Sequence, residues 1–252
     1  MPAIDFRRAS YLLVLAAACT CASGAARAGV VVDSTRVVYI STKREVSVSM
    51  RNVGDLPSLV QIWIDAGDPA VQPGNDTVPF ALTPPLFRLD PAKAQTLRLI
   101  YTQEPLARDR ETVFWLNVLD IPPRVSRGPE PSNRLEMAFR HRLKLFFRPS
   151  GLAGSAESAA ASVTWSIAQR GDDTVLEARN PTPFFVSFAE VKLSGGGNTI
   201  VDGPGMLAPF ANQQFKLSKQ AVRPTGQTTV QYGFVNDFGA IVRGEAVARA
   251  AS

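Results

Sequence analysis

Hydrophobic and polar residues alternate without a break through the segment from Asn133 to Pro149. The odd-numbered face carries Leu135, Met137, Phe139, His141, Leu143, Leu145 and Phe147, and the charged face carries Arg134, Glu136, Arg140, Arg142 and Lys144. A period of two residues predicts a β-strand with one solvent-facing side. From Asn133 to Phe147 this strand would span about 50 Å, at about 3.3 Å per residue. Most strands have only about 5–6 residues.

A strand of that length extends beyond the core of its own domain. Part of its apolar face would then lack an intramolecular partner. Such a free segment is either an aggregation hazard or a device for binding another chain by strand addition. Periodicity alone leaves open a third interpretation, in which this is an ordinary long strand in a large sandwich.

Shorter alternating segments with turn residues between them fill the rest of the chain, and none shows a convincing helical period. They are Glu45–Asn52, Leu59–Asp65, Gln95–Tyr101, Thr112–Leu119, Ser162–Ala168, Thr174–Asn180, Phe184–Leu193 and Thr228–Val235. This pattern predicts an all-β protein made of β-sandwiches. The length suits two domains of roughly a hundred residues each. Because Ser150–Gly154 is turn-prone and an Ala/Ser-rich stretch follows, we place the domains at residues 29–150 and 154–252.

Residues 1–28 have the features of a secretory signal peptide. Arg7 and Arg8 form a basic start, and Tyr11–Ala18 is an apolar run too short to span a bilayer. Ala26-Arg27-Ala28 is a small-x-small cleavage site, which predicts export of the chain and cleavage after Ala28. A lipoprotein signal with Cys19 as the lipidated residue remains an alternative.

Charge and cysteine content exclude several classes of protein. Removing residues 1–28 removes Arg7, Arg8, Arg27 and Asp5, so the basic and acidic counts fall from 27 and 22 to 24 and 21, a net charge of +3. The basic residues are dispersed, which argues against nucleic-acid binding. Both cysteines, Cys19 and Cys21, lie in the signal, so the mature chain would have no thiolate metal site. We expect no cofactor, no metal and no stable membrane insertion.

Several blocks of the sequence resemble the periplasmic chaperones of the chaperone–usher pilus pathway. The clearest is Leu106–Pro123, with its Asp-Arg-Glu, aromatic-x-Asn and Ile-Pro-Pro elements. The supporting blocks are Thr35–Tyr39, Thr83–Leu89, Arg98–Tyr101, Lys144–Pro149 and Gly233–Gly239. The resemblance covers essentially all of Gly29–Ala248. It implies two immunoglobulin-like sandwiches set at an angle, with a cleft between them, and a strand lent to pilus subunits that lack one. These are properties of the family, not deductions from this sequence.

The resemblance also implies site residues. Arg36 and Lys144, with Thr35, would hold the subunit's C-terminal carboxylate in the cleft, where two cations give charge-assisted hydrogen bonds. Leu135, Met137 and Phe139 would fill the subunit's groove. The alternatives are solvated surface charges for the first set and ordinary core packing for the second.

A second implied group, Glu111, Arg148 and Asp237, would form a charge cluster that sets the angle between the domains. The cluster would stabilise the arrangement of the domains only if it is partly buried, because exposed ion pairs contribute little. The loop Arg124–Ser132 has no flanking cysteine pair and is not greatly extended, which favours the short-loop branch of the family. The partners implied are pilus subunits and an outer-membrane usher.

Two other functional classes compete with this interpretation. An enzyme would need partners for His141, the one histidine, and none can be placed in the sequence, so we expect no catalysis. A secreted adhesive or structural protein of two immunoglobulin-like domains would share the composition and the signal. It would not need Arg36 and Lys144 to lie together, so their proximity separates the two hypotheses.

Overall fold

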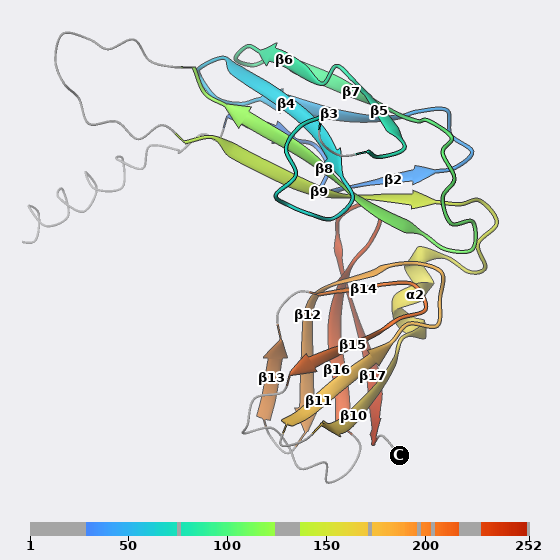
Figure 1. Ribbon diagram of the computed structural model, residues 1–252. Coiled ribbons are helices and arrows are strands. Elements are labelled where there is room, and N and C mark those ends of the chain that lie inside the picture. Colours follow the sequence, from blue (N-terminus) through green and yellow to red (C-terminus); the bar gives the residue numbers. More distant parts are fainter. Residues whose placement is uncertain are drawn as a thin grey trace, which may run out of the picture.

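The computed structural model describes residues 29–74, 77–123, 137–170, 173–195, 198–202, 205–216 and 228–250. Two separate hydrophobic cores divide these residues, one built between Val30 and Phe147 and the other between Ala159 and Ala248. They correspond to the upper and lower bodies of Figure 1. The predicted all-β architecture of two sandwich domains is confirmed. The predicted signal at residues 1–28, the loop Arg124–Ser132 and Leu135 lie outside the described residues.

The N-terminal domain consists of two facing sheets with strand orders β1-β3-β7-β5 and β2-β9-β8-β4-β6. The alternation of each strand buries one face in the core. In β3, for example, Val48 and Met50 are buried whereas Ser47 and Ser49 are exposed. The strands are β1 (Val30–Val32), β2 (Arg36–Ile40), β3 (Val46–Asn52), β4 (Ser58–Asp65), β5 (Phe80–Thr83), β6 (Leu86–Leu89), β7 (Ala94–Tyr101), β8 (Thr112–Ile121) and β9 (Phe139–Arg148).

The strands of the C-terminal domain form one hydrogen-bonded path, β13-β12-β16-β17-β10-β11-β15, with β14 paired to β12. Its core is centred on Trp165, whose ring stacks on Tyr232 at 6.0 Å between centroids. The strands are β10 (Thr164–Arg170), β11 (Asp173–Arg179), β12 (Val186–Gly195), β13 (Asn198–Asp202), β14 (Gly205–Leu207), β15 (Asn212–Lys216), β16 (Thr228–Val235) and β17 (Ile241–Ala250).

The Ala/Ser-rich stretch after the domain boundary is helical although the sequence shows no convincing helical period there. It forms α2 (Ala156–Ser162), and Ser155 caps the helix by accepting a hydrogen bond from the Ser158 N–H at 3.2 Å. Alanine is the best helix former, and Ala159 and Ala160 are buried. A helix of two turns is too short to give a helical period. No helix of the described residues is long and apolar enough to cross a membrane.

The long strand begins later than the sequence predicts. β9 starts at Phe139, and Met137 and Ala138 have no regular secondary structure, while Asn133–Glu136 lie outside the described residues. Within β9 the predicted apolar face is correct for the buried Leu143, Leu145 and Phe147. The opposite face is not simply solvated as predicted, because Phe146 is buried there. Its ring lies 5.6 Å from that of Phe185 in the C-terminal domain.

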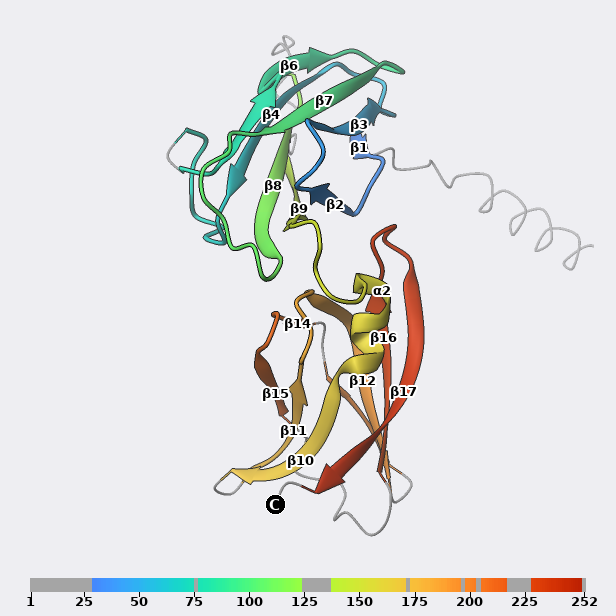
Figure 2. The same ribbon diagram turned by 90° about the vertical axis from the view of Figure 1, so that its right-hand side faces the viewer.

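β9 has neighbouring strands of unequal length. It pairs with β8 from Phe139 to Phe147, but with β2 only from Lys144 to Arg148. No strand of the described residues borders the outer edge of Phe139–Leu143, which we call the open half of β9. Lys144–Arg148 is the inner half. The inner half lies beside the C-terminal domain, whose β16–β17 turn reaches the N-terminal domain (Figure 2).

Candidate functional site

Arg36 and Lys144 are direct neighbours where the inner half of β9 begins. In the parallel pairing of β2 with β9 they occupy the first matched position. Val37 and Tyr39 of β2 are buried in the core, so alternation turns Arg36 to the opposite face, toward the C-terminal domain. The two cations come from positions more than a hundred residues apart, and the sheet register alone brings them together.

Arg36 contacts the C-terminal domain but uses few of its hydrogen-bond donors. Its Nη1 donates to the backbone carbonyl of Val235 at 2.7 Å, and the guanidinium lies 5.8 Å from the centre of the Phe146 ring. Its Nε is buried without a hydrogen-bond partner among the described residues. A guanidinium has five N–H donors in a fixed fork. The group therefore keeps donor capacity for another acceptor.

Lys144 is also held by the C-terminal domain. Its Nζ donates to the Oγ of the buried Ser187 at 3.1 Å and lies 5.9 Å from the centre of the Trp115 ring. Burial, reinforced by the positive charge of Arg36, lowers the pKa of Lys144 to about 8. An ammonium has three donors, and Ser187 is its one hydrogen-bonded partner among the described residues. A bound anion would favour its charged form.

Thr35, the third predicted anchor residue, is exposed and lies at the junction of the domains. Its Oγ1 packs against Gly239 in the β16–β17 turn, where any side chain would collide with the hydroxyl. Gly239 has a φ of +85°, a conformation that also favours glycine. The structure therefore places Thr35, the residue before Arg36, against the β16–β17 turn of the other domain.

Glu111, Arg148 and Asp237 form a partly buried cluster across the domain junction. Arg148 donates through Nε to Glu111 at 2.6 Å and through Nη1 and Nη2 to the two oxygens of Asp237 at 2.7 and 2.9 Å. The Phe185 N–H donates to the second oxygen of Glu111 at 2.7 Å. Burial raises the pKa of Glu111, and the nearby Arg148 opposes this rise only in part. One guanidinium thus joins both domains through two carboxylates.

The predicted groove-filling residues lie beyond the inner half of β9. Met137 and Phe139 keep 51% and 50% of their surface exposed. His141 is exposed on the same strand, opposite Val118. The expectation that Met137 and Phe139 do not pack fully into their own domain is confirmed. Leu135 lies outside the described residues, so its exposure stays a prediction.

Arginines on the other face of the open half are fixed to β4 and β8. Arg142 donates to both oxygens of Asp65, at 2.5 and 3.2 Å, and Asp65 is 0% exposed. Arg140 donates to Asn117 at 2.9 Å and to the Pro69 carbonyl at 2.7 Å. Desolvation raises the pKa of Asp65, but hydrogen bonds from Arg142, Asn117 and the Gly67 N–H outweigh it and lower the pKa overall. In the open half of β9, the face predicted to be solvent-exposed therefore carries an ordered network of hydrogen bonds and ion pairs.

Two family models match the chain in succession. The model described as "Pili and flagellar-assembly chaperone, PapD N-terminal domain" matches residues 29–153, and "Pili assembly chaperone PapD, C-terminal domain" matches residues 158–246. The chain belongs to the PapD family of pilus-assembly chaperones.

Individual members of the PapD family are similar over most of their length. Chaperone protein FimB/FhaD of Bordetella pertussis is 42% identical over 222 residues, which cover 86% of this chain and 87% of that protein. The crystal structure of the YadV chaperone is 37% identical with a TM-score of 0.75, covering 87% of this chain and 100% of that one. The SafB chaperone of Salmonella enterica, solved with the SafA pilin, is 28% identical with a TM-score of 0.71 over 89% and 98% of the two chains.

The sequence of this PapD-family chain did not reveal the hydrogen-bond acceptors of Arg36 and Lys144. Val235 contributes only a backbone carbonyl, which no residue type signals. Ser187 is one serine among many. The polar network of the open half did leave a trace in the sequence. Each of three neighbouring strands has two polar or aromatic residues at positions i and i+2, which point to the same face of the sheet. These pairs are Trp63 and Asp65, Trp115 and Asn117, and Arg140 and Arg142.

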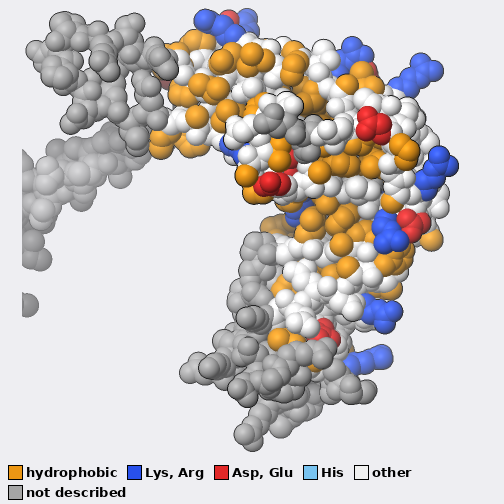
Figure 3. Space-filling model, in the orientation of Figure 1, with side chains coloured by type: hydrophobic (Ala, Val, Ile, Leu, Met, Phe, Trp, Pro, Cys, Tyr) orange, Lys and Arg blue, Asp and Glu red, His pale blue; other side chains and the backbone are white. Residues whose placement is uncertain are grey.

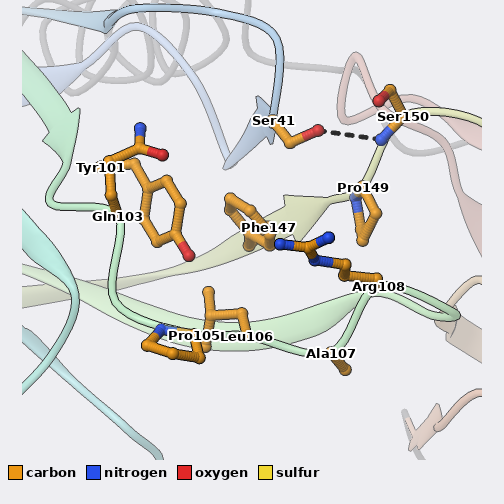
Figure 4. A pocket seen from close by; sticks show the side chains of 10 residues that line it. All are labelled: Ser41, Tyr101, Gln103, Pro105, Leu106, Ala107, Arg108, Phe147, Pro149 and Ser150. Carbon is orange, nitrogen blue, oxygen red and sulfur yellow. Dashed lines mark hydrogen bonds between the residues drawn. The ribbon is translucent and has the colours of Figure 1, made fainter.

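One hollow of the N-terminal domain is lined by neither Arg36 nor Lys144. It has a volume of about 490 Å³ and lies where β9 meets the interdomain linker (Figure 4). Phe147 and Tyr101 form part of its wall, and the Ser150 N–H donates to Ser41 Oγ at 2.9 Å. Arg108 is the one charged residue among its lining residues. Ligand sites need several converging polar groups, so we assign no chemistry to this hollow.

The surface around the domain junction is of mixed character. Apolar side chains cover much of the upper domain on the face drawn in Figure 3, and Lys and Arg side chains gather along the right-hand edge of both domains. Around Arg36 and Arg148 the domains meet closely, leaving only about 10 Å³ of free space. The pocket between Arg36 and Arg148 is therefore too small to admit a further hydrogen-bonding group.

Proposed function

We propose that this chain is a periplasmic chaperone that binds pilus subunits by lending them β9 and delivers them to an outer-membrane usher. One observation carries the proposal. Two partly buried cations with unused donors lie in register where the open half of β9 meets its inner half. A pilus subunit that lacks its last strand would pair with the open edge and end at the cations.

Arg36 and Lys144 would bind the subunit's terminal carboxylate, with Thr35 as a further hydroxyl. Two cations aimed at one carboxylate give charge-assisted hydrogen bonds. They also fix where the added strand ends. A slip of one residue would turn every side chain of that strand to the wrong face, so the anchor selects the register as well as adding affinity.

Leu135, Met137 and Phe139 would fill the subunit's hydrophobic groove. Each side chain would contribute about 1.5–3 kcal/mol on full burial, before the cost of ordering the partners. Met137 and Phe139 are already half exposed, so binding would bury apolar surface that the free chaperone leaves in water. The backbone of the open half would supply hydrogen bonds to the subunit along the same edge.

Glu111, Arg148 and Asp237 would set the angle between the domains and so the distance between the anchor and the C-terminal domain. We also propose that residues 1–28 direct export and are removed after Ala28, and that the domains span residues 29–150 and 154–252. Delivery to an outer-membrane usher follows from the pathway that the family serves.

The test is periplasmic co-expression with a pilus subunit of the same organism, followed by measurement of the soluble subunit that co-purifies. The Arg36→Ala, Lys144→Ala double variant should lose most of the captured subunit while remaining folded. The matched control, Lys93→Ala with Arg98→Ala, removes two exposed cations of the same domain and should capture normally. Equal capture by both double variants would contradict the anchor. An adhesive protein would show no subunit capture by the wild type.

A further inference from the structure

Gly29 and Asp120 meet at the edge of the N-terminal domain. The Val30 N–H donates to Asp120 Oδ2 at 2.9 Å, and the Gly29 carbonyl accepts from the Val53 N–H at 2.9 Å. Any side chain on Gly29 would collide with the same Asp120 oxygen, and Ser58 Oγ lies close by. From standard backbone dimensions the Gly29 nitrogen is within roughly 5 Å of that carboxylate.

Asp120 is a buried carboxyl group with too few partners. It is 4% exposed, and its Oδ1 has no hydrogen-bond partner among the described residues. None of the ion pairs in the described part of the chain includes it. Burying a carboxylate without a cation is costly, so such groups are normally paired. The site therefore has an acceptor in place, and none of the described residues gives it a positively charged donor.

We propose that the cleavage after Ala28, on whose proposal above this inference rests, supplies this donor, because the new α-ammonium of Gly29 pairs with Asp120 and holds β1 against the domain. Water hydrolyses the Ala28–Gly29 peptide bond, the carboxylate leaves with Ala28, and the amine of Gly29 takes up a proton. The uncleaved chain has an uncharged amide at this position. Removal of the leader thus does more than release the protein, since it completes an ion pair that the precursor cannot form.

The position of β1 explains why such a lock matters. β1 has three residues and lies at the edge of its sheet, where β3 is its one partner strand in the described part of the chain. Its Val30 is 1% exposed in the core. A short edge strand with one neighbour frays easily. A buried ion pair at its first residue holds Val30 in the core, and glycine at residue 29 leaves room for the carboxylate beside the chain end.

The experiment compares chains that differ only at the N-terminus. One begins at Gly29 and the other carries two extra alanines before Gly29, with both ends verified by mass spectrometry. Each is made as wild type, as Asp120→Asn, and as Asp90→Asn, which alters an exposed carboxylate of the same domain. Denaturant unfolding gives the stability, and hydrogen exchange of residues 29–40 reports on β1 directly.

For the wild-type protein, we expect the chain that begins at Gly29 to have an unfolding equilibrium constant about 10- to 100-fold lower than that of the chain with two extra alanines. Exchange of β1 should slow in the same form. The Asp90→Asn control should keep this difference, and Asp120→Asn should abolish it. Equal stability of the two wild-type forms, or a difference that survives in Asp120→Asn, would overturn the proposal. If Asp120→Asn does not fold, Nα-acetylation of the wild-type Gly29 chain replaces it, and unchanged stability and exchange after acetylation would overturn the proposal.

Discussion

The inner and open halves of β9 belong to one strand, yet among the strands that the structure describes only the inner half has a neighbour on both sides. Phe147 and Phe139 lie on the same face of that strand, eight residues apart, and are 4% and 50% exposed. The side chain and the alternation are the same, so the neighbouring elements decide which phenylalanine enters the core. The comparison separates the residues that stabilise the domain from those that remain available to a partner.

Phe147→Ala should produce the largest effect on stability. Phe147 packs against Tyr39 and Tyr101, with ring centres 6.2 and 4.6 Å away. Its loss should lower the free energy of unfolding of the N-terminal domain by about 3–5 kcal/mol, because the core retains a cavity. Phe139→Ala is the matched change in the open half and should alter denaturant unfolding far less. Similar losses from both would contradict the division of the strand.

Arg142→Met should come next, because it removes the nearer of the two cations paired with the fully buried Asp65 and leaves only Arg140, at 3.7 Å. Breaking such a pair costs about 3–5 kcal/mol, and we expect the lower end because Asn117 and the Gly67 N–H still bond Asp65. Hydrogen exchange of the open half should accelerate more than that of the inner half. The control is Arg98→Met, which removes an exposed pair with Glu45 and should leave the unfolding free energy unchanged. Uniform acceleration along β9 would show that Arg142 does not act locally.

Phe139→Ala should mainly weaken subunit binding. Losing the burial of this side chain in a subunit's groove removes about 1.5–3 kcal/mol, which is roughly a ten- to hundredfold loss of affinity. Titration calorimetry or surface binding with a purified subunit, together with a melting curve of the variant, separates the two effects. A variant that melts early and binds normally would reverse the roles assigned to the open half.

The smallest effect expected is a loss of subunit affinity at alkaline pH. The pKa of Lys144 is about 8 in the free protein, and a bound carboxylate would raise it by favouring the ammonium. The affinity for the subunit is therefore highest below pH 8. It falls as the pH rises through 8, by at most about tenfold per pH unit. Lys144→Met should bind more weakly and show no such fall. A wild-type affinity that is constant from pH 7 to about pH 9.5 would contradict the titration of Lys144 in this role.

Period-two alternation predicted the fold and the face of β9 because burial of one face is a local property of a strand. It treated Phe139 and Phe147 alike, since the difference depends on where β2 begins to pair, at Arg36. The roles of Arg36, Lys144 and the Glu111 cluster came from family resemblance. Ser187 and the Val235 carbonyl were not predictable, because the interdomain packing that brings them to the cations leaves no local pattern.

The charged face shows the same limit of local patterns. Arg140 and Arg142 alternate with apolar residues, as solvated side chains do. Their partners Asp65 and Asn117 come from β4 and β8, and the similar spacing of residues on the three strands indicates a network only once their register is known. A helix of seven residues after the boundary escaped prediction for a different reason. It is too short for periodicity, although its cap residue Ser155 was visible in the sequence.

The most direct test of the carboxylate anchor uses two peptides with the sequence of a pilus subunit's C-terminal strand, one with a free carboxylate and one amidated. Wild-type chaperone should bind the free form about 10- to 100-fold more tightly, the loss expected for charged hydrogen bonds. The Arg36→Ala, Lys144→Ala variant should bind both forms equally and weakly. Equal binding of the two peptides by the wild type would contradict the central claim that Arg36 and Lys144 recognise the terminal carboxylate.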